Sequence, residues 1–461
     1  MGNLYLETTP LPLPDDLKVT MQSFSMVLPS EKTERRTMFL SNIDQILDFN
    51  VQTIHFFEAN AEFSPDKVVE KIEDALRRLL VPYDFLAGRL KFNPTEARLE
   101  IECNAAGIGF AVASSELTLK EIGNLVYPNS AFRELVHGHD VPAPDSDDPP
   151  MFVLQVTSFK CGGFAMSISN NHILMDGISF KMFLQNLASL AADKPLAITP
   201  YNDRTLLSAR SPPQVSFAHP ELLELPQVEG QEHNAKLFQV TDENLDVKVY
   251  HLSGSDIMRL RKKAKMDISG VEESTIKITS FNVVMAHIWR CKALSGTIEN
   301  YDPNKVSTIL YAVDIRSRLG PPEFPSSYTG NAVINGYGMA KVHEMKEKPF
   351  SYLVKMMNEG TSRISDEYVR SVVDWGELHK GFPCGDVLVS SWWKLGFEEV
   401  QYPWGRPKYS CPLVHYRKDI ILFFPEMDGV VDKGVNVLVA LPGPEMKKFQ
   451  ELFDGFLADI A

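Results

Sequence analysis

The stretch Phe164-Ala165-Met166-Ser167-Ile168-Ser169-Asn170-Asn171-His172-Ile173-Leu174-Met175-Asp176-Gly177 changes its pattern halfway along. Its first part alternates between apolar and small or polar residues, as a half-buried strand does. Beyond Gly177 the apolar residues recur at helical spacing and predict a helix: Phe180, Phe183, Leu184, Leu187 and Ala191. Asp176 is well placed to cap that helix. His172, the side-chain type best suited to move a proton near neutral pH, is therefore expected where strand gives way to helix.

The surrounding segments predict both strands and helices. Residues 152–159 have strand composition, and Lys160-Cys161-Gly162-Gly163 is a hairpin signal that joins them to residues 164–169. Residues 49–57 predict another strand, and Ser64-Pro65-Asp66 predicts the start of a helix. Later patterns predict helices near 256–265, 280–294 and 445–460, and a strand near 308–314.

A proline-rich stretch divides these two sets of elements. Residues 193–233 show no clear periodicity and contain Pro195, Pro200, Pro212, Pro213, Pro220 and Pro226. So long a stretch without a regular pattern is typical of a crossover linker between domains. The sequence therefore predicts two α/β domains. We expect an N-terminal domain at residues 1–192, a linker at 193–235 and a C-terminal domain at 236–461.

The composition excludes several classes of protein. A net charge of −14 disfavours nonspecific nucleic-acid binding and docking to anionic membranes, because both need positive charge. No apolar run approaches the roughly 20 residues of a membrane span, and the first residues lack the pattern of a signal peptide. The five cysteines lie far apart with no CxxC pair, which favours free thiols in a reducing compartment. We expect a cytoplasmic protein.

The spacing of His172 and Asp176 alone does not decide what the histidine does. It could be a core residue whose ring is satisfied by backbone groups. The two side chains could also share a helix face and bind a metal. No further pair of His, Asp or Glu has matching spacing, so we expect no metal site.

Five segments, in order along nearly the whole chain, resemble the motifs of the plant BAHD acyltransferases, which use coenzyme A thioesters. The run from His172 to Gly177 resembles the HxxxDG motif. The others resemble PxxAGR, DxRxR…YxGN, (T/S)SW and the end of DFGWG: Pro82-Tyr83-Asp84-Phe85-Leu86-Ala87-Gly88-Arg89-Leu90, Asp314-Ile315-Arg316-Ser317-Arg318 with Tyr328-Thr329-Gly330-Asn331, Ser390-Ser391-Trp392, and Trp404-Gly405-Arg406-Pro407. Five ordered motifs are far more specific than the histidine and aspartate alone.

The resemblance implies a fold and a reaction. Members of the family have two similar-sized mixed-sheet α/β domains of the chloramphenicol-acetyltransferase-like type, with a solvent channel between them. His172 would lie in that channel as a general base and deprotonate an alcohol or amine acceptor, which attacks the acyl-CoA thioester. By the same resemblance, the Trp392 indole N–H would stabilise the oxyanion, with Ser390 nearby. No acyl-enzyme and no permanently bound cofactor are implied.

The resemblance also implies supporting residues. The motif acid of the family turns away from substrate and pairs with an arginine, which maps Asp176 onto Arg316. Ser253 ends a segment similar to the family's FxLS, and a basic run follows it at residues 259–265. Lys262 and Lys263 are candidates for binding the CoA phosphates, although a solvated helix face accounts for such a charge run equally well.

The chain departs from the family pattern at one motif. Gln401-Tyr402-Pro403 stands where the family has DFG, so the acid is missing and proline replaces glycine.

We expect a monomeric enzyme of specialised metabolism that moves an aromatic or hydroxycinnamoyl-type acyl group to a small-molecule acceptor, preferably a neutral apolar alcohol or an amine. Two alternatives remain: a non-catalytic accessory protein of lipid elongation on the same fold, and a condensation-type domain of a peptide assembly line.

Overall fold

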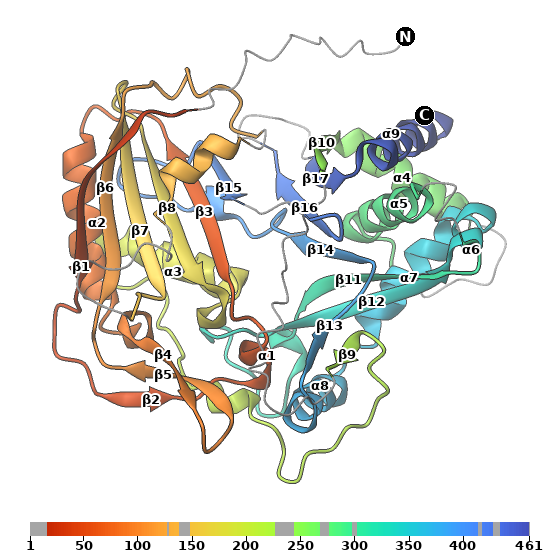
Figure 1. The fold of residues 1–461 in the computed structure, drawn as a ribbon, viewed down its shortest axis with the longest axis horizontal. Helices are drawn as coiled ribbons and strands as arrows, with labels where there is room; N and C mark the ends of the chain where they lie inside the picture. The colour runs from red at the N-terminus through yellow and green to blue at the C-terminus, as the bar shows by residue number, and fades with distance from the viewer. Residues whose placement is uncertain are drawn as a thin grey trace.

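A computed structural model describes residues 16–126, 129–137, 148–225, 244–267, 276–296, 302–413, 417–426 and 434–460. Two six-stranded sheets form the centre of the protein and lie side by side, each with helices on its outer face (Figure 1). Both sheets contain parallel and antiparallel pairs. The predicted α/β class with two mixed sheets is confirmed.

The first sheet contains the stretch that precedes His172. Its strand order is β1 (Val19–Val27), β6 (Ile108–Ser115), β7 (Phe152–Phe159), β8 (Phe164–Asn171), β3 (Asn50–Phe57) and β15 (Tyr409–Leu413). Strands β7 and β8 pair antiparallel across the predicted Gly-Gly turn. A smaller sheet of β2 (Arg36–Met38), β5 (Arg98–Cys103) and β4 (Arg89–Asn93) lies at one end.

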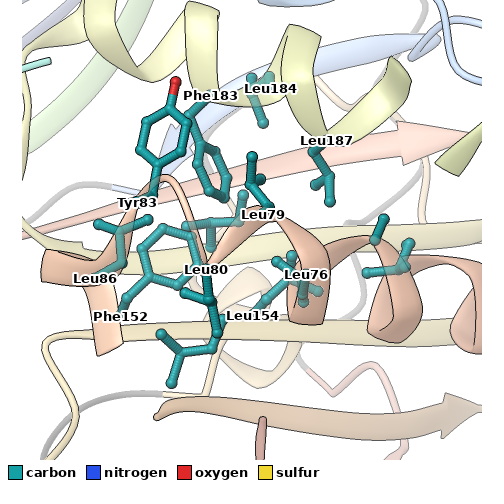
Figure 2. Packing of buried hydrophobic residues seen from close by; sticks show 14 of the residues in the cluster. Leu76, Leu79, Leu80, Tyr83, Leu86, Phe152, Leu154, Phe183, Leu184 and Leu187 are labelled. Atoms are coloured by element: carbon teal, nitrogen blue, oxygen red, sulfur yellow. The ribbon is translucent and has the colours of Figure 1, made fainter. Parts of the chain in front are cut away.

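Helices α2 (Pro65–Leu79) and α3 (Gly177–Ala191) cover the outer face of the first sheet. The Ser64 side chain accepts a hydrogen bond from the Lys67 backbone N–H, so α2 begins at the predicted cap. The two helices bury their apolar stripes against each other and against β7, as Figure 2 shows. The residues of this cluster include Leu76 and Leu79 of α2, Phe183, Leu184 and Leu187 of α3, and Phe152 and Leu154 of β7.

The second sheet has the strand order β10 (Asp246–Leu252), β17 (Val435–Leu441), β16 (Ile420–Pro425), β14 (Val387–Ser391), β11 (Val306–Asp314) and β12 (Val333–Lys341). Helices α4 (Gly254–Met266), α5 (Ser280–Leu294), α7 (Phe350–Ser362) and α9 (Gly443–Asp459) pack on its outer side (Figure 1). The remaining elements are α1 (Asn42–Gln45), α6 (Val342–Glu347), α8 (Asp366–Leu378), and the paired strands β9 (Leu222–Glu224) and β13 (Gly381–Pro383).

The inner faces of the two sheets meet in one apolar cluster, the interface cluster. It joins Ile54 and Phe56 of β3 to Leu422 and Phe424 of β16 and Leu438 of β17. Strand β15 strengthens this junction, because it comes from the C-terminal part of the chain yet pairs with β3 (Figure 1). The first sheet is therefore completed by residues that follow most of the second sheet in sequence.

The crossover segment runs along the surface with little regular structure. It contains a short 3-10 turn at Arg204–Leu207 and strand β9. The division at residues 193 and 235 remains a prediction, and residues 226–243 lie outside the described part of the chain. Among the helices that the structure describes, none is long and apolar enough to cross a membrane.

Candidate active site

His172 follows directly after β8 and begins a 3-10 turn, His172–Leu174. Its backbone N–H donates to the Phe49 carbonyl at 2.8 Å, and its ring lies 5.1 Å from the Phe49 ring. The Asn171 side chain caps the turn by accepting from Ile173 N–H at 3.0 Å. His172 is partly exposed, whereas the three residues after it are buried. A partly exposed residue on an anchored backbone is placed where a substrate could reach it.

A buried amide contacts the imidazole from the side of the second sheet. Nδ1 of His172 lies 3.1 Å from Oδ1 of Asn331. Nδ2 of Asn331 in turn donates to the His172 carbonyl at 3.0 Å and to the Asp44 carboxylate at 2.8 Å. Burial lowers the pKa of His172, and this effect outweighs the hydrogen bond of the ring to its own backbone, the charge of Asp176, the hydrogen bond to Asn331 and the charge of Asp44, which all raise the pKa. The neutral ring that a general base requires is therefore favoured.

Asp176 caps helix α3 and pairs with Arg316. One carboxylate oxygen accepts from Ser179 N–H at 2.9 Å, as the sequence pattern predicts for a cap. Arg316 donates to both oxygens of Asp176, at 2.9 and 3.1 Å, and to the Ser179 hydroxyl at 2.8 Å. Burial opposes the charged carboxylate, but the guanidinium outweighs it and holds the pKa of Asp176 below its usual range. The Asp176 carboxylate therefore joins the turn that follows β8 of the first sheet to the loop that follows β11 of the second sheet.

A second ion pair lies on the other side of the His172 turn. Asp44 of α1 and Arg204 of the crossover segment are both fully buried and 3.0 Å apart. Arg204 also donates to the carbonyls of Ile173 and Leu174. Two buried arginines, Arg204 and Arg316, therefore hold the turn that runs from His172 to Asp176.

Ser390 and Trp392 lie at the end of β14, on the inner side of the second sheet. Val387 and Val389 point into the outer core, so Ser390 faces the other way, like its register partner Leu422 in the interface cluster. Trp392 packs against both the interface cluster and the core of the first sheet. Trp393, in contrast, is buried and donates its indole N–H to the Gly434 carbonyl at 2.9 Å.

An aromatic chain connects Trp392 to helix α3. The Trp392 ring is 5.4 Å from Phe397 in an edge-to-face arrangement, and Phe397 is 5.3 Å from Phe180 in the same geometry. Phe180 lies one turn beyond Asp176 in α3. The segment that follows β14 therefore docks on the helix that begins at the HxxxDG motif.

The residues predicted to bind CoA lie at or on helix α4, which packs on the outer side of the second sheet. Ser253 is the N-cap of α4 and exchanges hydrogen bonds with Asp256, so its hydroxyl already has a structural role. Lys263 pairs with Asp267 at 2.8 Å. Lys262 is exposed. Of these three residues, Lys262 is the one best placed to meet a phosphate.

The altered motif forms a tight turn against the core of the first sheet. Tyr402 and Gly405 exchange backbone hydrogen bonds at 3.1 Å, and the rings of Tyr402 and Trp404 stack at 5.3 Å. Both rings are buried, and Phe57 lies edge-on to each of them. Gln401 is exposed. The missing acid therefore leaves an exposed position, and Pro403 lies in a turn that accommodates it.

Three further residues of the site, Asn331, Asp44 and Arg204, have no role that their local sequence predicts. Asn331 ends the YxGN segment, but this motif does not predict that its side chain contacts His172 and Asp44. Asp44 follows Ser41 at the spacing of a capping box, and the structure contains that box, but its further contacts are long-range. Among the described residues, no cluster of three or more His, Cys, Asp or Glu could hold a metal.

Two mixed sheets joined at their inner faces, with a partly exposed histidine after β8, define an acyltransferase fold of the chloramphenicol-acetyltransferase-like class. Solved structures support this class. Vinorine synthase superposes with a TM-score of 0.70 at 20% identity, covering 93% of this chain and 96% of that one. F. graminearum TRI101, complexed with coenzyme A and T-2 mycotoxin, gives a TM-score of 0.71 at 15% identity, covering 90% and 96%.

Sequence comparison defines the family. A model described as Transferase family matches residues 17–455. Acyltransferase GLAUCE of Arabidopsis thaliana is 54% identical over 99% of this chain and 100% of its own. Two other Arabidopsis thaliana proteins are fatty alcohol:caffeoyl-CoA acyltransferase, at 33% identity over 95% and 99%, and omega-hydroxypalmitate O-feruloyl transferase, at 32% over 95% and 93%. The chain belongs to the BAHD family of acyl-CoA-dependent acyltransferases.

Proposed function

We propose that the protein transfers a hydroxycinnamoyl-type acyl group from CoA to the hydroxyl of a neutral, apolar alcohol, with His172 as general base. The observation that carries this proposal is the position of His172, a partly exposed residue whose Nδ1 contacts Asn331, so that Nε2 is the ring nitrogen left for substrate. The acyl class and the long-chain alcohol class are supported by the two relatives whose names specify caffeoyl or feruloyl groups and a fatty alcohol or a hydroxypalmitate. The fatty alcohol is the neutral one of these two acceptors, because hydroxypalmitate carries a carboxylate. An amine acceptor is the second choice.

The reaction needs one base and no covalent enzyme intermediate. Nε2 of His172 takes the acceptor proton while the acceptor oxygen forms a bond to the thioester carbonyl carbon. The tetrahedral intermediate collapses as the carbon–sulfur bond breaks. His172 then returns the proton to the departing thiolate, which leaves as free CoA. Each turnover restores the neutral ring that burial already favours.

Trp392 is the proposed donor to the oxyanion, with Ser390 nearby. Its ring is packed edge-to-face with Phe397, and the N–H of the neighbouring Trp393 is already used in the fold. A preoriented donor gains strength where charge develops, because it does not need to reorganise during the reaction.

We further propose that both substrates reach His172 through a channel that passes between the two sheets beside the interface cluster. Acyl-CoA would enter from the side of α4, where exposed Lys262 would meet the phosphates, and the acceptor from the opposite side. Asp176 and Arg316 would hold the His172 turn rather than contact substrate, as their mutual pairing suggests.

The test is release of CoA thiol from feruloyl-CoA and caffeoyl-CoA with a panel of primary alcohols and amines of graded chain length, together with mass spectrometry of the products. We expect ester products with long-chain alcohols, and loss of about 10³-fold or more of kcat in His172→Ala. If wild type releases no thiol with any acceptor, or if His172→Ala retains full activity, the proposal is wrong. The first outcome is what an accessory protein of lipid elongation would give.

The protein is further proposed to act as a cytoplasmic monomer with domains at 1–192 and 236–461. The five cysteines support a reducing compartment, because all are free and two are exposed. Sedimentation at micromolar concentration and imaging of a fluorescent fusion measure the two properties directly. A dimer, or fluorescence confined to a membrane-bounded compartment, would contradict them.

A further inference from the structure

We propose that Asn331, held by Asp44 and Arg204, is a positioning residue that fixes which nitrogen of His172 carries the proton. The inference rests on the proposed role of His172 as a base and extends it to three residues outside the HxxxDG motif. It also assigns the carboxylate that supports the base to Asp44, which lies 128 positions before His172 in sequence.

The orientation of the Asn331 amide follows from its neighbours. Its Nδ2 faces three acceptors: the Asp44 carboxylate at 2.8 Å and the carbonyls of His172 and Ile173 at 3.0 and 3.2 Å. A flipped amide would place its oxygen against all three, which is unfavourable. Oδ1 must therefore point at the imidazole, and it can only accept. In the neutral ring the proton is then on Nδ1, and the lone pair is on Nε2.

The Asp44 carboxylate is itself hydrogen-bonded at both oxygens. One oxygen accepts from the Ser41 backbone and hydroxyl at 2.9 and 2.8 Å. The other accepts from Asn331 and from Arg204. A fully buried, fully hydrogen-bonded carboxylate does not rotate easily, so the amide next to it is held in one orientation.

Asp176 does not serve this purpose. Its two oxygens accept from Arg316, Ser179 N–H and Ala332 N–H, and none of these hydrogen bonds joins it to the ring. The motif acid and Asp44 therefore hold the same turn in different ways: one through the cap of α3, the other through the side chain that contacts Nδ1.

The experiment compares Asn331→Ala with wild type in two measurements. The first is the ¹⁵N spectrum of histidine-labelled protein, with the His172 signals assigned by their loss in His172→Ala. Wild type is expected to show a protonated Nδ1 and an unprotonated Nε2. Asn331→Ala is expected to show a mixture of the two tautomers. The second is steady-state kinetics, in which kcat should fall about 10²-fold with the KM for acyl-CoA within about twofold.

Asn171→Ala is the matched control for structural perturbation. Asn171 is a buried amide at the start of the same turn that bonds Ile173 N–H and Asp48 but not the ring. Its loss should lower the melting temperature and leave the His172 tautomer as in wild type. Asn331→Ser, which leaves room for a water on Asp44, repeats the test if Asn331→Ala does not fold.

A folded Asn331 variant that keeps Nδ1 fully protonated would overturn the inference, and so would one whose kcat stays within about threefold of wild type. The spectrum needs no substrate, so this result is separate from the failure of the proposed function. If His172→Ala keeps acyl transfer, the proposed function is wrong even where the tautomer responds to Asn331 as expected.

Discussion

Gly177 and Leu395 are packed so closely that a Cβ atom added to the glycine would lie 2.7 Å from Leu395 Cδ1. Gly177 is the first residue of α3, and Leu395 donates its backbone N–H to the Trp392 carbonyl at 3.2 Å. The glycine of the HxxxDG motif is therefore the point at which the Trp392 segment rests on the helix that follows His172.

Gly177→Ala should displace Leu395 and, with it, Trp392. We expect about 1–2 kcal/mol of lost stability, from overpacking, together with a lower kcat. Leu395→Ala in the same chain removes the clashing atoms, so the double variant should be more stable than the sum of the two single changes predicts. Thermal unfolding of the four proteins measures this coupling. If the two changes in the free energy of unfolding simply add, the contact between Gly177 and Leu395 is not the cause of the lost stability.

Trp392→Phe should separate the N–H donor from the aromatic packing. The phenyl ring keeps an edge-to-face contact with Phe397 but has no donor for an oxyanion. We expect kcat to fall about 10²- to 10³-fold, with little change in the KM for either substrate. Steady-state kinetics with a single acyl-CoA are sufficient. An unchanged kcat would assign the oxyanion to another donor.

Lys262 and Lys263 should respond differently to neutralisation. Lys262→Gln is expected to raise the KM for acyl-CoA about threefold to tenfold, because an exposed cation is lost. Lys263→Gln should have a smaller effect, since Lys263 is already paired with Asp267. The KM for the acceptor should not change in either variant. If the KM for acyl-CoA is the same in both variants and wild type, this face of α4 is exposed to solvent and does not bind CoA.

The lowered pKa of His172 sets the acid limb of the pH–rate profile. The proposed general base must be neutral to accept a proton, so kcat/KM should rise with pH and level off, with a midpoint below the ordinary pKa of about 6.5. A midpoint above that value would contradict the burial argument. The charged groups around the turn are Asp44, Asp48, Asp176, Arg204 and Arg316, and of these the charges of Asp176 and Asp44 raise the pKa of His172 against the effect of burial.

Acid should weaken the fold through Asp176. Its pKa is depressed in the folded state, so its contribution to stability is present above the unfolded value of about 3.9 and is lost as pH falls through the folded value. Asp176→Asn leaves Arg316 partly unpaired and should lower the free energy of unfolding by about 3 kcal/mol at pH 7. The difference in free energy of unfolding between wild type and Asp176→Asn should narrow as pH falls below about 4. A folded Asn variant of normal stability that has lost only its chemistry would contradict a supporting role for Asp176.

Local pattern is enough to predict the elements around the histidine. The change from alternating to helical spacing at Gly177 predicts the end of β8 and the start of α3, and Ser64 predicts the start of α2, because each depends on neighbouring residues only. The spacing in the sequence is also enough to predict the pairing of Lys263 with Asp267, because oppositely charged residues four apart share a helix face.

Contacts between distant segments cannot be derived in this way. Asp44, Arg204 and Asn331 belong to a short helix, a crossover segment and a loop, and no periodicity relates them. Arg316 is identified only through the family resemblance. Strand β15 is a short run of mixed residues, and nothing in its pattern indicates that its partner is β3 rather than a strand of the second sheet.

The pairing of β15 with β3 has a consequence for synthesis of the chain. Strand β3 ends at residue 57 and β15 begins at residue 409, so a ribosome releases the edge of β3 long before its partner exists. An unpaired strand edge invites mispairing with other nascent chains. We expect the first sheet to be completed only after translation of most of the second, and truncated products that lack residues 409–413 to aggregate rather than accumulate as a free N-terminal half.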